Sequence, residues 1–338
     1  MKHFVIVLLL LLLPYSTIAY AYAEGDWELT NNKNGIMTYK RIQPGSKLLQ
    51  LRAITVIDAR MENFGQVLRD LSAYPLWMDM CKQAELVDKI DENNMTLHLL
   101  MDFPVVSNRD LIVKADTLYD LKKARGIITI NMVKNSPVPV YKGALRMPEF
   151  NGSYVLEYIT REKTGVIYTY NADPGGYLPS FAVNLVGKYM LYNTLKNLKD
   201  MVKKDKYVQG GQRSKDRVLF EDILSDNARV KGILKARIME HCRDAEMIDS
   251  VVSDQNIVDL LIKGDGQLIQ QLFFSWGSRE SMEKTVRAIL QIHAQKYTSD
   301  KKIIEKIAND QRLINSIIDG SKPGQPSAMD IIRTLSRS

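Results

Sequence analysis

The longest amphipathic pattern in the chain begins after a cluster of helix-breaking residues. A Pro-Gly-Gly run at 174–176 and Pro179 precede Ser180, a residue type that caps helices. Apolar residues then recur at helical spacing, at positions 181, 185, 186, 189, 195 and 198. This pattern predicts an amphipathic helix from Ser180 to about Val202. Its apolar face needs a hydrophobic surface to pack against.

The region before this helix alternates between apolar and polar residues, which is typical of strands. Alternating stretches at 35–41 and 48–57 precede a helical pattern at 62–71. Further strands are expected at about 84–90, 95–102, 109–118, 125–133, 153–161 and 164–172. The order of these elements predicts an α+β domain, in which a curved antiparallel sheet wraps around the long helix. Such a fold encloses a core that can contain a cavity.

The C-terminal part of the chain has a different pattern. Residues 204–216 are polar, contain glycines and lack periodicity, so we interpret them as a linker. From 217 to 338 the pattern is helical, and N-cap signatures recur near positions 225, 253, 299 and 309. Short helices must pack together to be stable, so an all-α domain is expected. Binding a partner protein, covering the first domain and dimerising all remain open as its role.

The N-terminus has the layout of a secretory signal peptide. Lys2 and His3 precede an apolar run at 4–13, and small residues follow in Ala21-Tyr-Ala23. The apolar run is short for a membrane span, although a retained anchor is the alternative. We expect residues 1–23 to be cleaved and the protein to be secreted across the inner membrane of a bacterium into the periplasm.

Composition and charge narrow the class of protein. The 338 residues, of which 45% are hydrophobic and 25% charged, describe a globular chain long enough for two domains. The net charge of +7 is spread over scattered lysines without an Arg-rich block, so no nucleic-acid partner is expected. Two cysteines, Cys81 and Cys242, exclude a disulfide scaffold. We favour two separate buried thiols over a bridge between the domains.

Motifs for catalysis are not found in the sequence. The histidines His3, His98, His241 and His293 are isolated, with no spacing or cysteine pairing suited to zinc. Neither a nucleophile elbow, a phosphate-binding loop nor a dinucleotide-binding glycine motif is present. We therefore predict a protein that is not an enzyme and that uses no metal or cofactor.

Six short pieces in the first part of the chain resemble a START domain, the steroidogenic acute regulatory protein-related lipid-transfer family. The pieces are 26–27, 35–41, 74–77, 103–110, 143–146 and the Gly-Tyr-Leu-Pro-Ser sequence that opens the long helix. The resemblance implies a helix-grip fold over 24–203 and a hydrophobic tunnel for one lipid or sterol, gated by a loop and the C-terminal helix. Two features depart from the family pattern. The N-terminal helix of longer members is almost absent, and the chain continues to residue 338.

Candidate ligand-binding residues lie on the expected strands, on the final helix and beside the Tyr-Pro-Leu-Trp turn. Most of these inward residues must pack against one another rather than touch the ligand. The tyrosines are the ones to test, because a buried hydroxyl needs a hydrogen-bond partner and can offer itself to a lipid head or a sterol hydroxyl. Leu99 and Leu156 share the inward pattern of the strands. The candidates are Trp77, Met101, Phe103, Arg109, Leu111, Val113, Tyr154, Tyr168, Tyr170, Phe181, Leu185 and Tyr189.

Three of these features have two interpretations. Arg109 and Asp110 can form a salt bridge that fixes the start of a strand, which we favour, or Arg109 can meet a polar lipid head. Trp77 can pack in the core, which we favour, or line the tunnel. The segment 138–152 corresponds to the gating loop of the resemblance. Its apolar residues 138, 140 and 141 can enter a membrane interface, or the segment is an ordinary ordered turn.

The sequence thus predicts an exported lipid- or sterol-binding and transfer protein. It would hold one apolar ligand, touch membranes transiently and perform no chemistry. The alternative is a lipid-responsive interaction module whose C-terminal helical domain binds a partner protein. An enzyme is a third reading, because the wider helix-grip superfamily includes cyclases and hydrolases.

Overall fold

The computed structural model describes residues 27–42, 48–103, 106–176, 180–221, 226–238, 297–320 and 325–336, together with isolated residues between 223 and 294. Of the long helix, the side chains from residue 189 onward are described. The chain divides into two compact units at residue 221. Residues 121–123 group with the second unit, and the rest of 27–221 forms the first.

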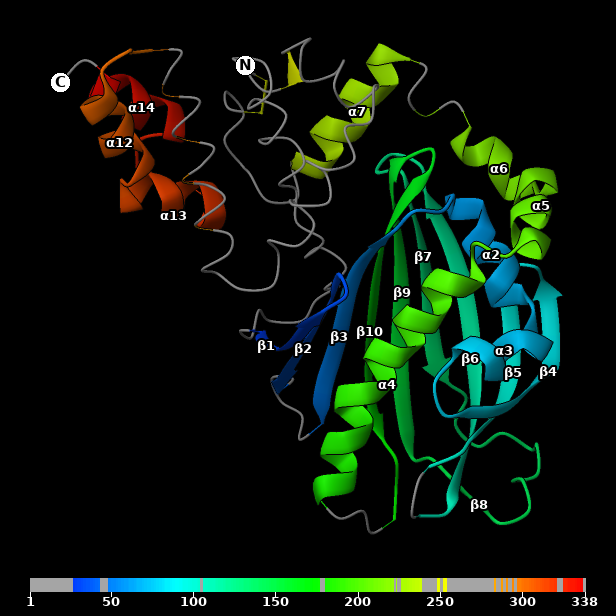
Figure 1. Ribbon diagram of the computed structural model, residues 1–338. Helices are drawn as coiled ribbons and strands as arrows, with labels where there is room; N and C mark the ends of the chain where they lie inside the picture. The colour runs from blue at the N-terminus through cyan, green and yellow to red at the C-terminus, as the bar shows by residue number, and fades with distance from the viewer. Residues whose placement is uncertain are drawn as a thin grey trace. The chain divides into compact units, whose positions relative to one another are not determined.

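The first unit is built on one curved sheet of ten strands (Figure 1). The strand order is β1-β2-β3-β10-β9-β7-β6-β5-β4, and β8 pairs with β6. Neighbours along this order are antiparallel, whereas β8 runs parallel to β6. The strands are β1 Glu28–Lys33, β2 Ile36–Ile42, β3 Leu49–Ile57, β4 Cys81–Asp91, β5 Asn94–Met101, β6 Asn108–Asp120, β7 Arg125–Met132, β8 Ala144–Arg146, β9 Glu149–Thr160 and β10 Lys163–Asp173.

Helices cover one face of this sheet. Figure 1 shows α4 crossing in front of the strands, with α2 and α3 beside it. Fully buried side chains between helices and strands include Phe64, Trp77, Leu191, Leu195 and Leu198. The helices are α2 Met61–Arg69, the 3-10 turn η2 Leu71–Ala73, α3 Tyr74–Trp77, α4 Ser180–Met201, α5 Asp205–Arg213 and α6 Lys215–Phe220.

The predicted elements of the first unit are confirmed in order and type. The long helix begins at Ser180 and ends at Met201, close to the bounds that the spacing predicted. Strands β1 and β8 were not predicted, because each is short and lies next to glycine or proline punctuation.

The prediction of a linker at 204–216 is wrong, because α5 lies entirely within this range and α6 begins at Lys215. Helix α5 packs on α2 through two glycines. A Cβ atom added at Gly211 would lie 3.1 Å from the Glu62 Cγ and 3.2 Å from the Asn63 backbone nitrogen, and one at Gly210 would lie 3.0 Å from the Gln66 side-chain oxygen. The glycines that suggested a linker are therefore what allows the two helices to approach closely.

The second unit contains four helices among its described residues: α7 Asn227–Ile238, α12 Lys301–Ala308, α13 Gln311–Asp319 and α14 Ala328–Ser336. The expected caps are present at two of them. Asp300 accepts a hydrogen bond from the Lys302 backbone nitrogen at 2.8 Å, and Asp310 accepts one from that of Arg312 at 3.0 Å. Helices α12, α13 and α14 share one apolar core that includes Ile304, Leu313 and Ile332.

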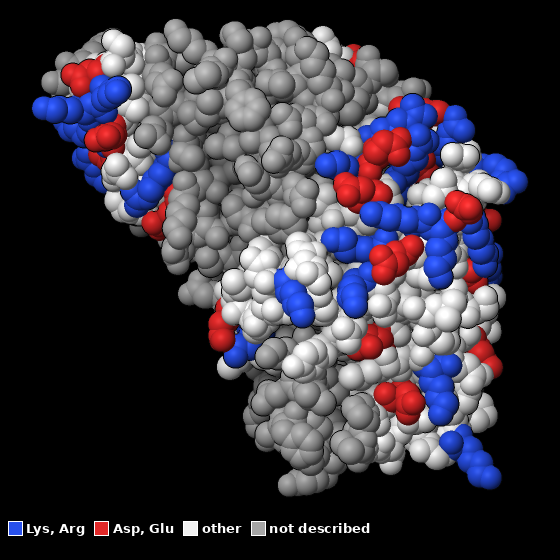
Figure 2. Space-filling view, in the orientation of Figure 1, with Lys and Arg blue, Asp and Glu red and all other residues white. Residues whose placement is uncertain are grey.

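Helices that could cross a membrane are not found in the part of the chain that the structure describes. The predicted signal peptide at 1–23 lies outside the described residues. On the face that Figure 2 shows, basic and acidic side chains are interspersed rather than gathered by sign.

Candidate ligand cavity

A cavity lies in the first unit, between helices α2 and α3 and the sheet. The space free of protein atoms is about 850 Å³, and this figure includes solvent at the open mouth. The volume that the centres of enclosed water molecules can occupy is much smaller, about 70 Å³. This is room for several waters, since one needs roughly 10–15 Å³ by the latter measure. A whole lipid therefore requires the cavity to widen.

The strands supply the cavity wall through their alternation. Every second residue of a strand faces the same side. The cavity accordingly takes its wall from residues two apart along four strands. They are Met95, Leu97 and Leu99 of β5, Val113, Ala115, Thr117 and Tyr119 of β6, Gly126, Ile128 and Ile130 of β7, and Tyr154 and Leu156 of β9.

The helices supply the opposite wall. From α2 come Met61, Glu62, Gly65, Leu68 and Arg69, from α3 Tyr74 and Trp77, and α6 adds Asp216 and Phe220. Met78 and Glu92 complete the lining. Most of these side chains are apolar, as is usual for a site that binds a small ligand.

Charged groups at the α6 end of the cavity are joined by Arg69. Its guanidinium lies 2.6 Å from the Asp216 carboxylate and donates to the Glu92 carbonyl at 3.1 Å. It also donates to the Asn93 side chain at 3.2 Å and to the Tyr119 hydroxyl at 3.3 Å. These bonds connect α2 to α6, to the turn between β4 and β5, and to β6. Hydrogen bonds and an ion pair therefore hold the segments at this end of the cavity together.

Glycine and aromatic residues fit α6 into this wall. A Cβ atom at Gly65 would lie 2.8 Å from the Asp216 carboxylate. The Arg69–Asp216 ion pair therefore fits beside α2 only because residue 65 has no side chain. Phe220 packs edge-on to Tyr119 with ring centres 5.7 Å apart. Burial, with the nearby Asp216 charge, raises the pKa of Tyr119 to about 12. Tyr119 is therefore a neutral hydroxyl at physiological pH.

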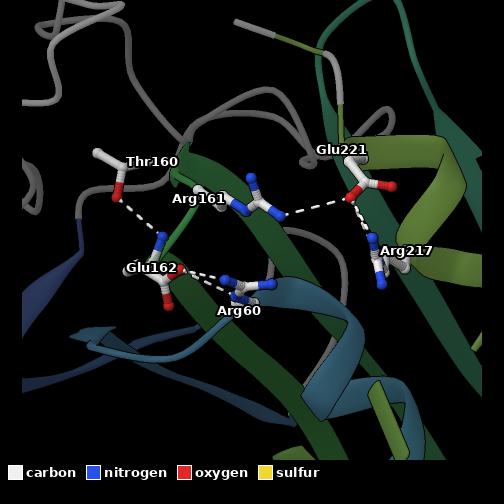
Figure 3. Close-up of polar contacts among 6 residues, drawn as sticks. All are labelled: Arg60, Thr160, Arg161, Glu162, Arg217 and Glu221. Carbon is white, nitrogen blue, oxygen red and sulfur yellow. Dashed lines mark hydrogen bonds and ion pairs between the residues drawn. The ribbon is translucent and has the colours of Figure 1, made fainter. Parts of the chain in front are cut away.

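The end of α6 is held to the sheet by a further set of ion pairs, shown in Figure 3. Glu221 accepts from Arg217 one turn earlier and lies 3.4 Å from Arg161, in the turn between β9 and β10. Glu162 in the same turn lies 2.6 Å from Arg60, the residue before α2. These pairs are largely exposed, so each adds little stability.

Two polar groups in the cavity lining have no hydrogen-bond partner of good geometry: the Trp77 indole nitrogen and the Tyr154 hydroxyl. Trp77 is 0% exposed and Tyr154 is 1% exposed. The Tyr154 ring stacks on that of Tyr168 with centres 4.1 Å apart. Burial, with a contribution from Tyr168, raises the pKa of Tyr154 well above its ordinary value. Both groups are thus uncharged and enclosed.

The structure brings three of the predicted site residues together in this cavity: Trp77, Val113 and Tyr154. Leu99 and Leu156 line it as well. For Trp77, whose core packing we had favoured, the structure combines both interpretations, since it is fully buried and also lines the cavity.

Other predicted residues are buried but lie outside the lining. Met101 follows the lining residue Leu99 by two residues along β5, and Leu111 precedes the lining residue Val113 by two residues along β6. Tyr168 and Tyr170 belong to β10, beyond the strands that form the wall. Phe103 packs beneath Arg109, with the guanidinium carbon 5.5 Å from the ring centre.

Tyr189 is a wrong prediction as an inward residue, because it is 46% exposed. It lies two residues before the fully buried Leu191, roughly 200° around the helix from it. The side chains of Phe181 and Leu185 lie outside the described residues.

The favoured salt bridge between Arg109 and Asp110 is not how the two residues are paired. The Arg109 guanidinium donates to the backbone carbonyls of Ser107, Pro174 at 2.6 Å and Gly175 at 3.1 Å. Asp110 instead accepts from Arg146 and lies 2.5 Å from the His98 ring nitrogen. The start of β6 is still fixed, but by bonds to two other segments, and Arg109 holds the Pro-Gly turn that precedes α4.

The segment at 138–152 is ordered, which favours the turn interpretation for its conformation. It contains β8 and the first residues of β9. Tyr141 stacks on His98 with ring centres 3.9 Å apart, and its hydroxyl donates to Glu85 at 2.9 Å. Val140 and Leu145 are 45% and 41% exposed. These exposed apolar residues are compatible with contact at a membrane surface.

Clusters of residues able to hold a metal ion are not found among the described residues. Cys81 is a buried free thiol, as predicted, and burial raises its pKa to about 11. Such a thiol is unreactive at physiological pH. Cys242 lies outside the described residues.

Sequence reasoning missed the lining residues of α2, β7 and α6. The alternation of Gly126, Ile128 and Ile130 could have identified the β7 positions. The α6 residues carried no such signal, because Asp216 and Phe220 are in or beside a polar stretch.

Comparison with known proteins assigns the first unit to a family. Residues 19–206, more than half of the chain, match the START domain family. The chain belongs to this family. The match ends at 206, so almost all of α5 and the whole of α6 lie beyond the START domain.

Relatives of this START protein include an uncharacterized protein of Pseudomonas aeruginosa, 29% identical over 187 residues, which are 54% of this chain and 90% of the relative. Mouse phosphatidylcholine transfer protein is 26% identical over 188 residues, which are 54% of this chain and 85% of the relative. The crystal structure of human STARD10 is 20% identical and covers 60% of this chain and 82% of its own, with a TM-score of 0.50. This likeness shows that the fold is shared. The predicted START family and helix-grip fold are thereby confirmed for the first unit.

Proposed function

We propose that this chain is an exported lipid- or sterol-binding protein that takes up one apolar ligand in the START cavity and transfers it between membranes. The observation that carries the proposal is the apolar cavity between α2, α3 and four strands of a START domain. The similarity to phosphatidylcholine transfer proteins supports a lipid as the ligand class. The proposal includes no chemical step.

The driving force for uptake is burial of the apolar part of the lipid. Each methylene removed from water contributes roughly 0.8 kcal/mol. The walls of β5, β6 and β7 offer the apolar surface that this requires. Because the centres of water molecules can occupy only about 70 Å³ of the cavity, part of the domain must move before a lipid enters. We place that movement at a membrane surface, where the exposed Val140 and Leu145 lie beside Lys142.

Native mass spectrometry of the purified protein, followed by lipid extraction, tests the binding half of the proposal. We expect one lipid per chain, and one class of lipid in the extract. A protein that is empty and takes up no lipid from a mixed panel would contradict it. Transfer is tested by exchange of labelled lipid between vesicles, which the protein should accelerate in proportion to its concentration.

Export is a separate part of the proposal, supported by the signal-like pattern at 1–23. Expression in a Gram-negative host, fractionation and N-terminal sequencing should place the mature protein in the periplasm with Glu24 as its first residue. Recovery of uncleaved protein in the membrane fraction would favour the retained anchor.

A second candidate is a lipid-responsive interaction module. It is favoured by the separate apolar core that α12, α13 and α14 form beyond the START match. In that case the protein would bind lipid without accelerating exchange between vesicles, and its affinity for a partner protein would change with lipid occupancy. The vesicle assay therefore separates the two candidates.

A further inference from the structure

Two buried hydrogen-bonding groups without partners belong to residues that line this mostly apolar cavity. The Trp77 indole nitrogen belongs to α3, and the Tyr154 hydroxyl belongs to β9 on the opposite wall. Both side chains are almost completely buried. A buried polar group without a partner costs free energy, and native proteins contain few of them. Two in the lining of one cavity need an explanation.

The neighbouring residues do not provide one. Leu97, Leu99 and Val113 in the adjacent wall have no side-chain acceptor. Two further polar groups in the lining are already engaged: the Tyr74 hydroxyl donates to the Leu68 carbonyl at 2.7 Å, and Arg69 is bonded at the α6 end. The Tyr168 hydroxyl is near enough to affect the pKa of Tyr154 but does not give it a hydrogen bond of good geometry.

The chemistry of the two groups defines what they can bind. An indole nitrogen only donates a hydrogen bond, whereas a tyrosine hydroxyl donates or accepts. A ligand atom shared by both must therefore accept hydrogen bonds. An anionic oxygen buried here would need a positive charge, and Arg69, the basic residue among the lining residues that the structure describes, is already paired with Asp216. The two groups thus match an uncharged oxygen.

We propose that Trp77 and Tyr154 form a subsite for one uncharged acceptor oxygen of the bound lipid, either an ester carbonyl or a hydroxyl. This inference rests on the proposed lipid-binding function and specifies its ligand. The subsite fixes the position of the lipid along the cavity, while the leucine and isoleucine walls accept its hydrocarbon without selecting among chains. A lipid with an oxygen at this position is preferred over one that is hydrocarbon there.

The test compares ligands that differ only in the acceptor. The probes are a diester phosphatidylcholine and its diether analogue, and cholesterol and the analogue without the 3-hydroxyl, each offered in vesicles to the full-length mature protein. Wild type should bind one oxygen-bearing probe more tightly than its matched analogue, and the pair that shows the difference identifies carbonyl or hydroxyl. Tyr154→Phe should weaken binding of that probe roughly five- to tenfold and leave binding of its analogue unchanged.

Control variants separate recognition from folding. Removing an unpaired buried hydroxyl does not remove a hydrogen bond, so Tyr154→Phe should keep or raise the melting temperature of the empty protein. Trp77→Phe, like Tyr154→Phe, should weaken binding of the oxygen-bearing probe and leave binding of its analogue unchanged. Tyr170→Phe removes a hydroxyl from a buried tyrosine of the same sheet that lies outside the lining, and it should bind all probes as wild type does.

The outcomes distinguish this inference from the function on which it rests. If wild type binds lipids but Tyr154→Phe and Trp77→Phe bind every probe equally well, the subsite is wrong and the lipid-binding function stands. If wild type binds none of the probes and carries no lipid after purification, both are wrong. A lipid-bound crystal structure in which a water, rather than the lipid, bridges Trp77 and Tyr154 would also overturn the subsite.

Discussion

Arg69 of α2 and Asp216 of α6 form an ion pair at 2.6 Å that joins the START domain to a helix beyond it. Both side chains are mostly buried, at 20% and 12% exposure. The pair closes one end of the cavity, so a segment outside the family match helps to shape the ligand site.

Asp216→Ala should destabilise the first unit and loosen the end of the cavity. It leaves the Arg69 guanidinium without its carboxylate, and loss of a charged hydrogen-bond partner at a partly buried site costs roughly 1–3 kcal/mol. Urea unfolding followed by tryptophan fluorescence measures this loss. Glu162→Ala is the matched control, because its pair with Arg60 is 64% exposed on the Glu162 side and should cost under about 1 kcal/mol. Equal effects of the two substitutions would contradict the role of Asp216.

Phe220→Ala should enlarge the cavity at the same end. Phe220 is 3% exposed and packs on Tyr119, so its removal should cost roughly 3–5 kcal/mol in stability, less if lipid fills the space. Lipids extracted from the variant should have longer or bulkier chains than those from wild type. An unchanged chain-length distribution would show that α6 does not limit the depth of the site.

Gly211→Ala should separate α5 from α2. The added methyl would press against Glu62 and the Asn63 backbone, and overpacking of this kind costs roughly 1–3 kcal/mol. Gly232→Ala on α7 is the control. Outside the backbone of α7 and the two chain neighbours, no atom of the described residues lies within 4 Å of its added Cβ, so the substitution should be neutral or stabilise the helix by roughly 0.5–1 kcal/mol. Thermal melting should therefore show a lower melting temperature for Gly211→Ala and an unchanged or higher one for Gly232→Ala, and an unchanged melting temperature for Gly211→Ala would contradict the close packing of α5 on α2.

The strands and the long helix could be predicted from sequence because local periodicity determines them. Ser180 begins α4, and the alternation in β5 and β6 correctly placed Leu99 and Val113 at the cavity. The helices α5 and α6 could not be predicted, because tertiary contacts stabilise them. Gly210 and Gly211 lower helix propensity, and only the presence of α2 makes them favourable.

The position of the site was predicted less well than the fold. Tyr154 and Tyr168 are neighbours across β9 and β10, and both are buried, yet only Tyr154 lines the cavity. Alternation tells which face of a strand a residue occupies, but not where along that face the space remains unfilled. The pairing of Asp110 with Arg146 likewise depends on β8 lying beside β6, which no local pattern indicates.

The acid stability of the first unit should depend on Asp70, at the end of α2. Burial alone would raise the pKa of this carboxyl, but hydrogen bonds from Lys206, Ser72 and Tyr207 outweigh it and lower the pKa from 3.8 to about 2. Because the pKa is lower in the folded state, the stabilisation is fully present above about pH 4 and is lost as the pH falls towards 2.

Asp70→Asn removes the titrating group, so the unfolding free energy of the variant should change less than that of wild type between pH 4 and pH 2. Two of the three hydrogen-bond partners, Lys206 and Tyr207, belong to α5. The loss of stability should therefore appear first as release of α5, seen as faster amide hydrogen exchange in 205–213. Parallel pH profiles for Asp70→Asn and wild type would instead mean that the carboxylate does not hold α5 on the START domain.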